Sequence, residues 1–366
     1  MAQNFKNVAI FIDSLGGGGA ERVMLNLAKG LLSAGHFPHI FCLESRKDHQ
    51  LPGNILVHVL YSDMKLKKIV NRSNIAKSAE QLQQLVTSIE KKNGPFNLCL
   101  ANLDPTNKLV ARCDFKNVYY VLHNSMEQEI ARERKLGPIK YFKKVKAKKV
   151  MDGKDLVAVS EGVAKEAESI NIITPKSVRT IYNPSDLDDI RQLSKEINFE
   201  IPKIPYLVHV GRVVKQKRHD ILFKALKMVP DIKLVLLCKD IEKARDLASR
   251  YGVEDRIITP GFTNNPYNWI AKAKLMVLSS DFEGLPTVLV ESLICKTPIV
   301  STDCKFGPRE ILTGEMAEFI VPVGDHVALA NKINQALKSP PSTHNAPILE
   351  EVTMDKAVAR YIALAN

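Results

Sequence analysis

Short apolar runs alternate with amphipathic segments along the first half of the chain. The runs lie at residues 8–12, 39–43, 56–60, 98–101, 118–122, 156–160 and 178–181. Between them, residues 75–90 form a long amphipathic segment, and Val23, Leu27 and Leu31 recur at helical spacing. Strands that alternate with helices predict an α/β fold with a doubly wound parallel sheet, in which ligands bind beyond the carboxyl ends of the strands.

The second half of the chain has a similar organisation. We predict strands at 206–212, 233–238, 257–262, 275–278 and 317–321, and a final helix at 349–365. A chain of 366 residues is long enough for about two domains, and we place the boundary near residue 183. The predicted division is residues 1–183, residues 184–348 and a terminal helix at 349–366.

The composition is that of an ordinary globular protein, with 45% hydrophobic and 25% charged residues. No apolar run approaches the roughly 20 residues that span a bilayer, and residues 1–7 lack the apolar core of a signal peptide, so we expect a cytoplasmic protein. The six cysteines show no CxxC spacing, which favours free thiols over disulfides or a zinc site. The net charge of +12 suits an anionic partner, but nothing resembles a nucleic-acid-binding module, so we expect no nucleic acid.

A pair of glutamates follows the apolar run at 275–278. Gly284 and Pro286 end the extended pattern, and proline suits the first turn of a helix, so we expect a helix to begin near Pro286. Glu283 then lies in the strand-to-helix turn, and Glu291 lies about two turns further on. A helix N-terminus attracts anions and carboxylates accept hydrogen bonds from hydroxyl groups, so the arrangement suits a phosphorylated ligand with sugar hydroxyls. The alternative is that Glu283 only caps the helix and Glu291 is a solvated surface residue.

A glycine-rich run at 16–19 follows the first apolar run and precedes a helical segment. Strand, glycine loop and helix form a phosphate-binding arrangement, because glycine lets the backbone approach an anion and the helix N-terminus donates N–H groups. The dinucleotide fingerprint GxGxxG would need a glycine where Glu21 stands, and the Gly-Lys-Ser/Thr of a Walker loop is missing. The alternative is a merely flexible turn.

Several motifs together resemble one enzyme family. They are Glu283 and Glu291 with seven residues between them, the segments 296–304 and 307–312, Gly18-Gly19-Ala20-Glu21-Arg22, Gly211-Arg212 followed by Lys217, and Tyr182-Asn183-Pro184. They resemble the retaining glycosyltransferases of family 4, in the version seen in bacterial surface-polysaccharide enzymes. The resemblance covers most of the chain and is strongest from residue 207 to 312. It implies the GT-B fold, in which two Rossmann-like doubly wound domains face each other across a cleft and a terminal helix crosses back to the first domain.

The resemblance also assigns site residues. The expected catalytic residues are Glu283, Arg212, Lys217 and His123, and the expected donor-binding residues are Gly17, Gly18, Gly261, Phe262, Thr263, Gly284, Leu285, Pro286 and Glu291. In this assignment Glu291 holds the ribose, Glu283 holds the donor sugar, and Arg212 with Lys217 clamps the diphosphate. Fixed cations in a water-poor site stabilise the negative charge that builds on a departing diphosphate. Such a clamp can replace a divalent ion, so we expect neither a metal nor a cofactor. For His123 the alternative is a histidine that merely caps a strand end.

The implied reaction is transfer of a sugar, with retention of configuration, from a nucleotide-diphosphate donor to a glycan or lipid-linked acceptor. The implied pathway is bacterial surface polysaccharide synthesis, meaning lipopolysaccharide, capsule or O-antigen. UDP is the carrier that we expect, although the residues identify neither base, sugar nor linkage. Two alternatives remain: a nucleotide-sugar epimerase on the same fold, and a non-catalytic membrane-associated partner protein.

A basic segment spans residues 135–154. Its lysines are Lys135, Lys140, Lys143, Lys144, Lys146, Lys148, Lys149 and Lys154. Ile139, Phe142 and Val145 recur every three residues, so a helix here would be amphipathic with a cationic face. Such helices lie on anionic membrane surfaces, which predicts peripheral contact with the inner face of the cytoplasmic membrane. The alternative is a solvated helix of a basic protein.

Overall fold

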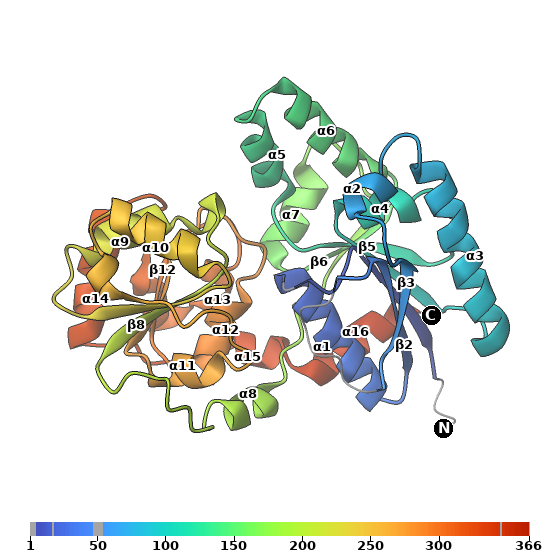
Figure 1. Ribbon diagram of the computed structural model, residues 1–366. Coiled ribbons are helices and arrows are strands. Elements are labelled where there is room, and N and C mark those ends of the chain that lie inside the picture. Colours follow the sequence, from blue (N-terminus) through green and yellow to red (C-terminus); the bar gives the residue numbers. More distant parts are fainter. Residues whose placement is uncertain (1–4, 17, 47–53, 345, 366) are drawn as a thin grey trace. The chain divides into compact units, whose positions relative to one another are not determined.

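The computed structural model describes residues 5–16, 18–46, 54–344 and 346–365. Contacts within the chain divide it into two compact units. The first unit contains Met1–Ser185 and Val352–Asn366, and the second contains Asp186–Glu351. Each unit is built on a parallel sheet of its own, with helices packed against it (Figure 1).

In the described part of the first unit, seven parallel strands form one sheet in the order β3-β2-β1-β4-β5-β6-β7. The strands are β1 (Asn7–Ile12), β2 (Phe37–Glu44), β3 (Leu56–Tyr61), β4 (Leu98–Asn102), β5 (Val118–Leu122), β6 (Asp155–Ala158) and β7 (Ser177–Thr180). The strand order reverses between β1 and β4. That switch point is where doubly wound sheets bind ligands.

Helices cover the first sheet as the sequence predicts. They are α1 (Gly19–Ser33), α2 (Leu66–Ile69), α3 (Ile75–Asn93), α4 (Asp104–Val110), α5 (Met126–Arg134), α6 (Pro138–Lys148) and α7 (Glu161–Ser169). Ser160 shows why one of them begins where it does, because its hydroxyl accepts a hydrogen bond from the N–H of Val163 at 3.3 Å and so caps α7.

The chain ends in two helices and not in the single helix predicted at 349–365. They are α15 (Ile348–Glu351) and α16 (Met354–Ala363). Between them, the carbonyl of Val352 accepts a hydrogen bond from the N–H of Ser185 at 2.8 Å, and Thr353 pairs with Ser185. This pairing uses backbone groups that a continuous helix would need, which explains the break. The helix α16 belongs to the first unit and packs on α1, where the side chain of Met354 fills the space above Gly30.

The described part of the second unit contains a six-stranded parallel sheet in the order β10-β9-β8-β11-β12-β13. The strands are β8 (Tyr206–Val210), β9 (Lys233–Leu237), β10 (Ile257–Ile258), β11 (Leu275–Leu278), β12 (Ile299–Thr302) and β13 (Ile320–Val321). The helices are α8 (Leu187–Leu193), α9 (His219–Leu226), α10 (Ile241–Arg250), α11 (Tyr267–Lys272), α12 (Thr287–Ile294), α13 (Pro308–Ile311) and α14 (His326–Lys338). Here the strand order reverses between β8 and β11, which is the second switch point.

Two of the strands predicted in the second half are much shorter than expected, with two residues each. The strand predicted at 257–262 ends at Ile258, because Pro260 has no N–H to donate and Gly261 turns the chain at a φ of 96°. The strand predicted at 317–321 begins only at Ile320. A 3-10 helix, Gly314–Phe319, occupies the preceding residues and buries Met316 and Phe319 at its three-residue period.

Within the residues that the structure describes, no helix is both long enough and apolar enough to cross a bilayer.

Candidate active site

The adjacent strands β8 and β11 place two of the predicted charges together at the second switch point. Lys217 ends the 3-10 turn Lys215–Lys217 that follows β8, and Glu283 lies in the turn between β11 and α12. The Nζ atom of Lys217 lies 2.7 Å from Oε1 of Glu283, and the two side chains are only 17% and 11% exposed. The structure therefore joins Lys217, one of the two predicted clamp residues, to the predicted donor-sugar carboxylate in one buried ion pair.

Hydrogen bonds between the two loops hold this pair in place. The N–H of Asp281 donates to the carbonyl of Gln216 at 2.8 Å, and Nε2 of Gln216 donates to the carbonyl of Phe282 at 2.7 Å. The hydroxyl of Ser279 donates to the carbonyl of Lys217 at 2.7 Å. These three hydrogen bonds flank the ion pair. They fix the backbone of both loops from which the two charged side chains project. The sequence did not predict this role of Gln216, because no neighbouring residue indicates that a glutamine will bond to a distant loop.

Arg218 is a second residue that the sequence analysis missed. It adopts a left-handed backbone conformation with a φ of 48°. Its guanidinium pairs with Asp220 at 2.9 Å and with Asp281 at 2.7 Å, and the hydrogen bonding that it donates to Asp220 is the main reason that its pKa is raised. The Arg218 side chain thereby ties the loop after β8 to the loop after β11. In the sequence, only the two-residue spacing between Arg218 and Asp220 indicates that Arg218 has an acidic partner.

The helix α12 begins directly after Pro286, as predicted. Glu291, on this helix, is only 7% exposed, which contradicts the alternative of a solvated surface residue. Gly284, Leu285 and Pro286 are buried in the turn before the helix. Gly307 packs so closely on Pro286 that a Cβ atom at position 307 would collide with the proline ring, and its φ of 91° also favours glycine. The turn that carries the predicted donor contacts is therefore enclosed by the segment before α13.

Four predicted residues of the second unit remain, three of them after β10 and one after β8. Gly261, Phe262 and Thr263 follow the edge strand β10, and β9 separates that strand from β8. The ring of Phe262 is 52% exposed, while Thr263 turns its hydroxyl to the carbonyl of Asn265 at 3.2 Å. Arg212 lies two residues after the end of β8 and is exposed at the carboxyl edge of the sheet. The roles of these four residues in donor binding stay predictions.

The first unit holds the other two predicted groups. Gly18 is the N-cap of α1, whereas Gly17 lies outside the described residues. His123 follows β5, and its Nε2 lies 2.8 Å from Oδ1 of Asn102 at the end of the neighbouring strand β4. Burial lowers the pKa of His123 to about 4, so its imidazole is neutral at physiological pH. It can donate or accept a hydrogen bond but supplies no charge.

Family comparisons decide the class of protein. The model of Glycosyltransferase Family 4 matches residues 17–189, and that of Glycosyl transferases group 1 matches residues 191–347. The chain belongs to this family of glycosyltransferases. It has the GT-B fold of two Rossmann-like domains: the structure of Anabaena Alr3699/HepE in complex with UDP-glucose matches 98% of both chains with a TM-score of 0.73 at 17% identity.

Two curated relatives also resemble this glycosyltransferase. One is the N-acetylgalactosamine-N,N'-diacetylbacillosaminyl-diphospho-undecaprenol 4-alpha-N-acetylgalactosaminyltransferase of Campylobacter jejuni. It is 28% identical over 348 residues, which cover 91% of this chain and 90% of the relative. The other is the lipopolysaccharide 1,6-galactosyltransferase of Salmonella typhimurium, which is 26% identical over 189 residues, or 48% of this chain and 51% of the relative.

A buried network of four charges in the glycosyltransferase's first unit includes two of the eight lysines of the basic segment 135–154. Lys148 lies 2.7 Å from both Asp104 and Glu129, and Lys144 lies 2.8 Å from Asp104 and 3.3 Å from Glu129. Burial alone would raise the pKa of Asp104, but Lys148 and Lys144 lower it to about 2. Two of the eight lysines therefore turn inward and fasten α6 to α4 and α5. The sequence could not show this, because helical spacing does not reveal which cations have buried partners.

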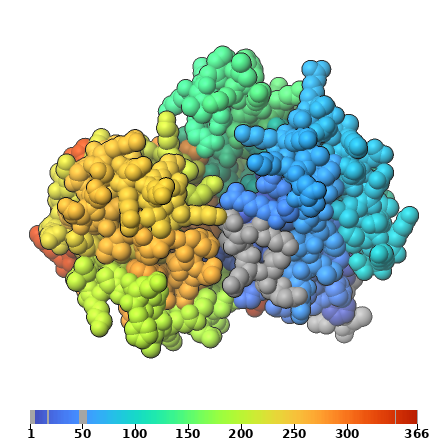
Figure 2. Space-filling view, in the orientation of Figure 1, coloured from blue at the N-terminus to red at the C-terminus, as the bar shows by residue number. Residues whose placement is uncertain are grey.

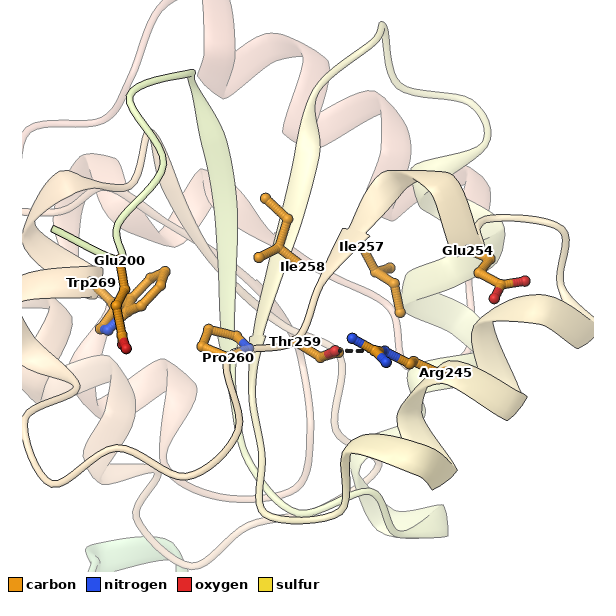
Figure 3. A pocket seen from close by; sticks show the side chains of 8 residues that line it. All are labelled: Glu200, Arg245, Glu254, Ile257, Ile258, Thr259, Pro260 and Trp269. Atoms are coloured by element: carbon orange, nitrogen blue, oxygen red, sulfur yellow. Dashed lines mark hydrogen bonds between the residues drawn. The ribbon is translucent and has the colours of Figure 1, made fainter.

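A pocket of about 610 Å³ in the second unit lies beside the edge strand β10 (Figure 3). It is lined by Glu200, Arg245, Glu254, Ile257, Ile258, Thr259, Pro260 and Trp269. None of the described residues that were predicted to bind the donor lines this pocket. The volume of the pocket is therefore no reason to place the active site of this glycosyltransferase there. In the described parts of the chain, no three His, Cys, Asp or Glu side chains gather as a metal-binding group.

Proposed function

We propose that this glycosyltransferase transfers a sugar from a UDP-sugar to a lipid-linked saccharide during bacterial surface polysaccharide synthesis, with retention of configuration. The observation that supports this most is the ion pair of Lys217 and Glu283 at the second switch point. A donor diphosphate would take the place of the carboxylate beside Lys217. Glu283 would then be free to accept hydrogen bonds from the donor sugar.

The chemistry of the pair fits the leaving group of such a reaction. Negative charge grows on the diphosphate as the sugar departs, and the ammonium group of Lys217 is held where that charge develops. Arg212 is exposed at the same strand end, and its planar guanidinium group would donate paired hydrogen bonds to phosphate oxygens. The backbone groups of Gly284 and Leu285, before α12, would contact the sugar or phosphate. Glu291 on that helix would hold the ribose.

The names of the relatives supply the substrate classes. The relative from Campylobacter jejuni is named for a saccharide carried on diphospho-undecaprenol, and the Anabaena structure contains UDP-glucose. Both the donor and the acceptor proposed here are of those classes.

Calorimetry with UDP, GDP and ADP, followed by a screen of their sugar derivatives against polyprenyl-diphosphate-linked saccharides, tests the proposal. We expect UDP to bind and to be released during transfer, and we expect the anomeric configuration of the donor to persist in the product. No binding of any nucleotide would refute a transferase function. Conversion of the donor sugar without an acceptor would reveal the epimerase alternative.

We predict that transfer proceeds at an unchanged rate in excess chelator. The proposed clamp of Lys217 and Arg212 supplies positive charge to the diphosphate without a divalent ion. Rates are to be compared in EDTA, in magnesium and in manganese with the same enzyme preparation. Loss of activity in EDTA, restored by either ion, would contradict the clamp.

We also propose that α5 and α6 dock on an anionic membrane. Figure 2 shows this segment, in green, at the surface. Ile139 is 70% exposed, Phe142 is 66% exposed, and Leu136 before α6 is 49% exposed. The lysines that are exposed beside them are Lys135, Lys140, Lys143, Lys146 and Lys149. Exposed apolar side chains among lysines fit an interfacial helix, in which the apolar groups enter the bilayer and the cations meet lipid phosphates.

Phe142→Asp is predicted to weaken binding to phosphatidylglycerol vesicles by roughly tenfold or more, because the lost burial of a phenyl ring is worth about 1.5–3 kcal/mol. Phe199→Asp is the matched control, since Phe199 is 96% exposed in the second unit and receives the same substitution. Vesicle sedimentation measures both variants. Equal binding by the Phe142 variant and the wild type would remove α6 from the membrane contact.

A further inference from the structure

Asp13 occupies the first switch point and is used by none of the roles assigned so far. It directly follows β1, while Thr106 lies in the first turn of α4, directly after β4. Oδ1 of Asp13 accepts hydrogen bonds from the N–H of Thr106 at 3.0 Å and from its hydroxyl at 2.6 Å. The aspartate is only 9% exposed. One residue after each of the two strands that flank the switch point thus contributes to a fixed polar group there.

The two oxygens of the Asp13 carboxylate differ in their hydrogen bonds to the described residues. In the described parts of the chain no hydrogen bond to Oδ2 is recorded, and both bonds from Thr106 converge on Oδ1. His123 lies at the end of β5 on the same edge of the sheet, two strands from β1. The carboxyl ends of β1 and β5 therefore carry a carboxylate and a neutral histidine at one edge of the sheet, and Thr106 is buried against the carboxylate.

The charge around Asp13 selects the kind of ligand. Burial raises the pKa of Asp13 to about 7, the hydrogen bonds from Thr106 oppose this, and Glu21 of α1 and Asp104 of α4 raise it further. No cation is paired with Asp13 among the described residues, so an anionic ligand group would be repelled. Hydroxyl groups of a neutral sugar donate hydrogen bonds to a carboxylate without that repulsion. A buried titratable group at a strand end, with a pKa shifted by burial and by neighbouring charges, is characteristic of ligand-binding positions.

We propose that Asp13, oriented by Thr106, binds a hydroxyl group of the acceptor saccharide at the switch point of the first unit. The proposal rests on the proposed sugar transfer, in which the second unit binds the nucleotide. It adds a specificity-determining residue on the acceptor side.

Saturation-transfer NMR with p-nitrophenyl glycosides of glucose, galactose, N-acetylglucosamine and N-acetylgalactosamine tests this at pH 8. We expect at least one glycoside to bind the wild type and to lose its signal at least tenfold in Asp13→Asn. The asparagine can still accept from Thr106 through its oxygen, but it offers an NH₂ group where Oδ2 stood. Thr106→Val, which removes the orienting hydroxyl, should weaken the same glycoside less.

The matched control is Asp114→Asn, because Asp114 is exposed before β5, at the opposite edge of the same sheet. Its glycoside signals should equal those of the wild type. Equal binding by Asp13→Asn and the wild type would overturn the proposal, and so would the absence of glycoside binding by a wild type that binds UDP. Failure to bind UDP would instead count against the proposed function alone.

Thermal unfolding separates ligand binding from a merely structural role. Since the pKa of Asp13 is raised in the folded state, its ionisation destabilises the fold increasingly as pH rises from about 4 to about 7. Asp13→Asn avoids that penalty, so its Tm should exceed that of the wild type at pH 8 and by less at pH 5. Loss of glycoside binding in a protein that is more stable would support the proposal. A lower Tm at pH 8 would show that the carboxylate serves the fold and would overturn it.

Discussion

Replacement of Lys217 by alanine is expected to lower kcat/KM for sugar transfer by about a hundred- to a thousand-fold, the usual effect of removing one fixed donor at a developing negative charge. Lys217 is held 2.7 Å from Glu283 by loops that Gln216 and Ser279 fasten together. Because the loops fix the position of Lys217 before the donor binds, its ammonium group only exchanges the Glu283 carboxylate for the diphosphate. The effect should appear mainly in kcat, since charge on the diphosphate grows only as the sugar leaves.

Steady-state transfer by Lys217→Ala and Lys215→Ala measures this effect. Lys215 belongs to the same 3-10 turn, is exposed and loses the same charge, so its alanine variant should stay within about twofold of the wild type if only the position of the cation matters. Glu283→Gln should also slow transfer, and the double variant should lose less than the sum of the single losses, because the two side chains contact each other. Wild-type turnover in Lys217→Ala would exclude the clamp.

The sequence predicted the sheets well because their signal is local. An apolar run such as 8–12 is buried whichever strand lies beside it, and Pro286 favours a helix start regardless of its neighbours. Contacts between distant loops have no such signal. Lys217 and Glu283 are 66 residues apart, and Lys148 and Asp104 are 44 apart, so each pairing depends on strand order.

The same distinction explains the errors. The predicted terminal helix fails at Val352, where the carbonyl accepts from Ser185 on a segment far away in the sequence. Asp13 looked like an ordinary loop residue, because only the neighbouring strand β4 brings Thr106 to it. The resemblance to family motifs could predict which residues of the second unit belong to the candidate site. It could not show that two lysines of the basic segment are buried.

Lys148→Met is expected to destabilise the first unit by about 3–5 kcal/mol, the usual cost of removing one partner from a buried ion pair. Methionine approximates the length of lysine, so packing is largely kept while Asp104 and Glu129 are left with Lys144 as their shared cation. Lys146→Met is the matched control, because Lys146 is exposed on the same helix and the change in charge is identical. Its effect should stay within about 0.5 kcal/mol.

Urea unfolding distinguishes the two units. The chain has a single tryptophan, and Trp269 lies in the second unit, so its fluorescence follows that unit while circular dichroism follows both. Lys148→Met should move the transition seen by circular dichroism to lower urea and leave the fluorescence transition in place. If the fluorescence transition moved to lower urea together with the circular dichroism transition, the loss of stability would not be confined to the first unit.

The pH dependence provides an independent test of the network. Burial would raise the pKa of Asp104, but Lys148 and Lys144 hold it at about 2, below its ordinary value of 3.8. A carboxylate with a depressed pKa contributes stability above the unfolded value and loses it as pH falls toward the folded one. The difference in stability between wild type and Lys148→Met should therefore be full at neutral pH and shrink between about pH 4 and pH 2. A difference that stays constant over that range would mean that Lys148 stabilises the fold by packing and not by charge.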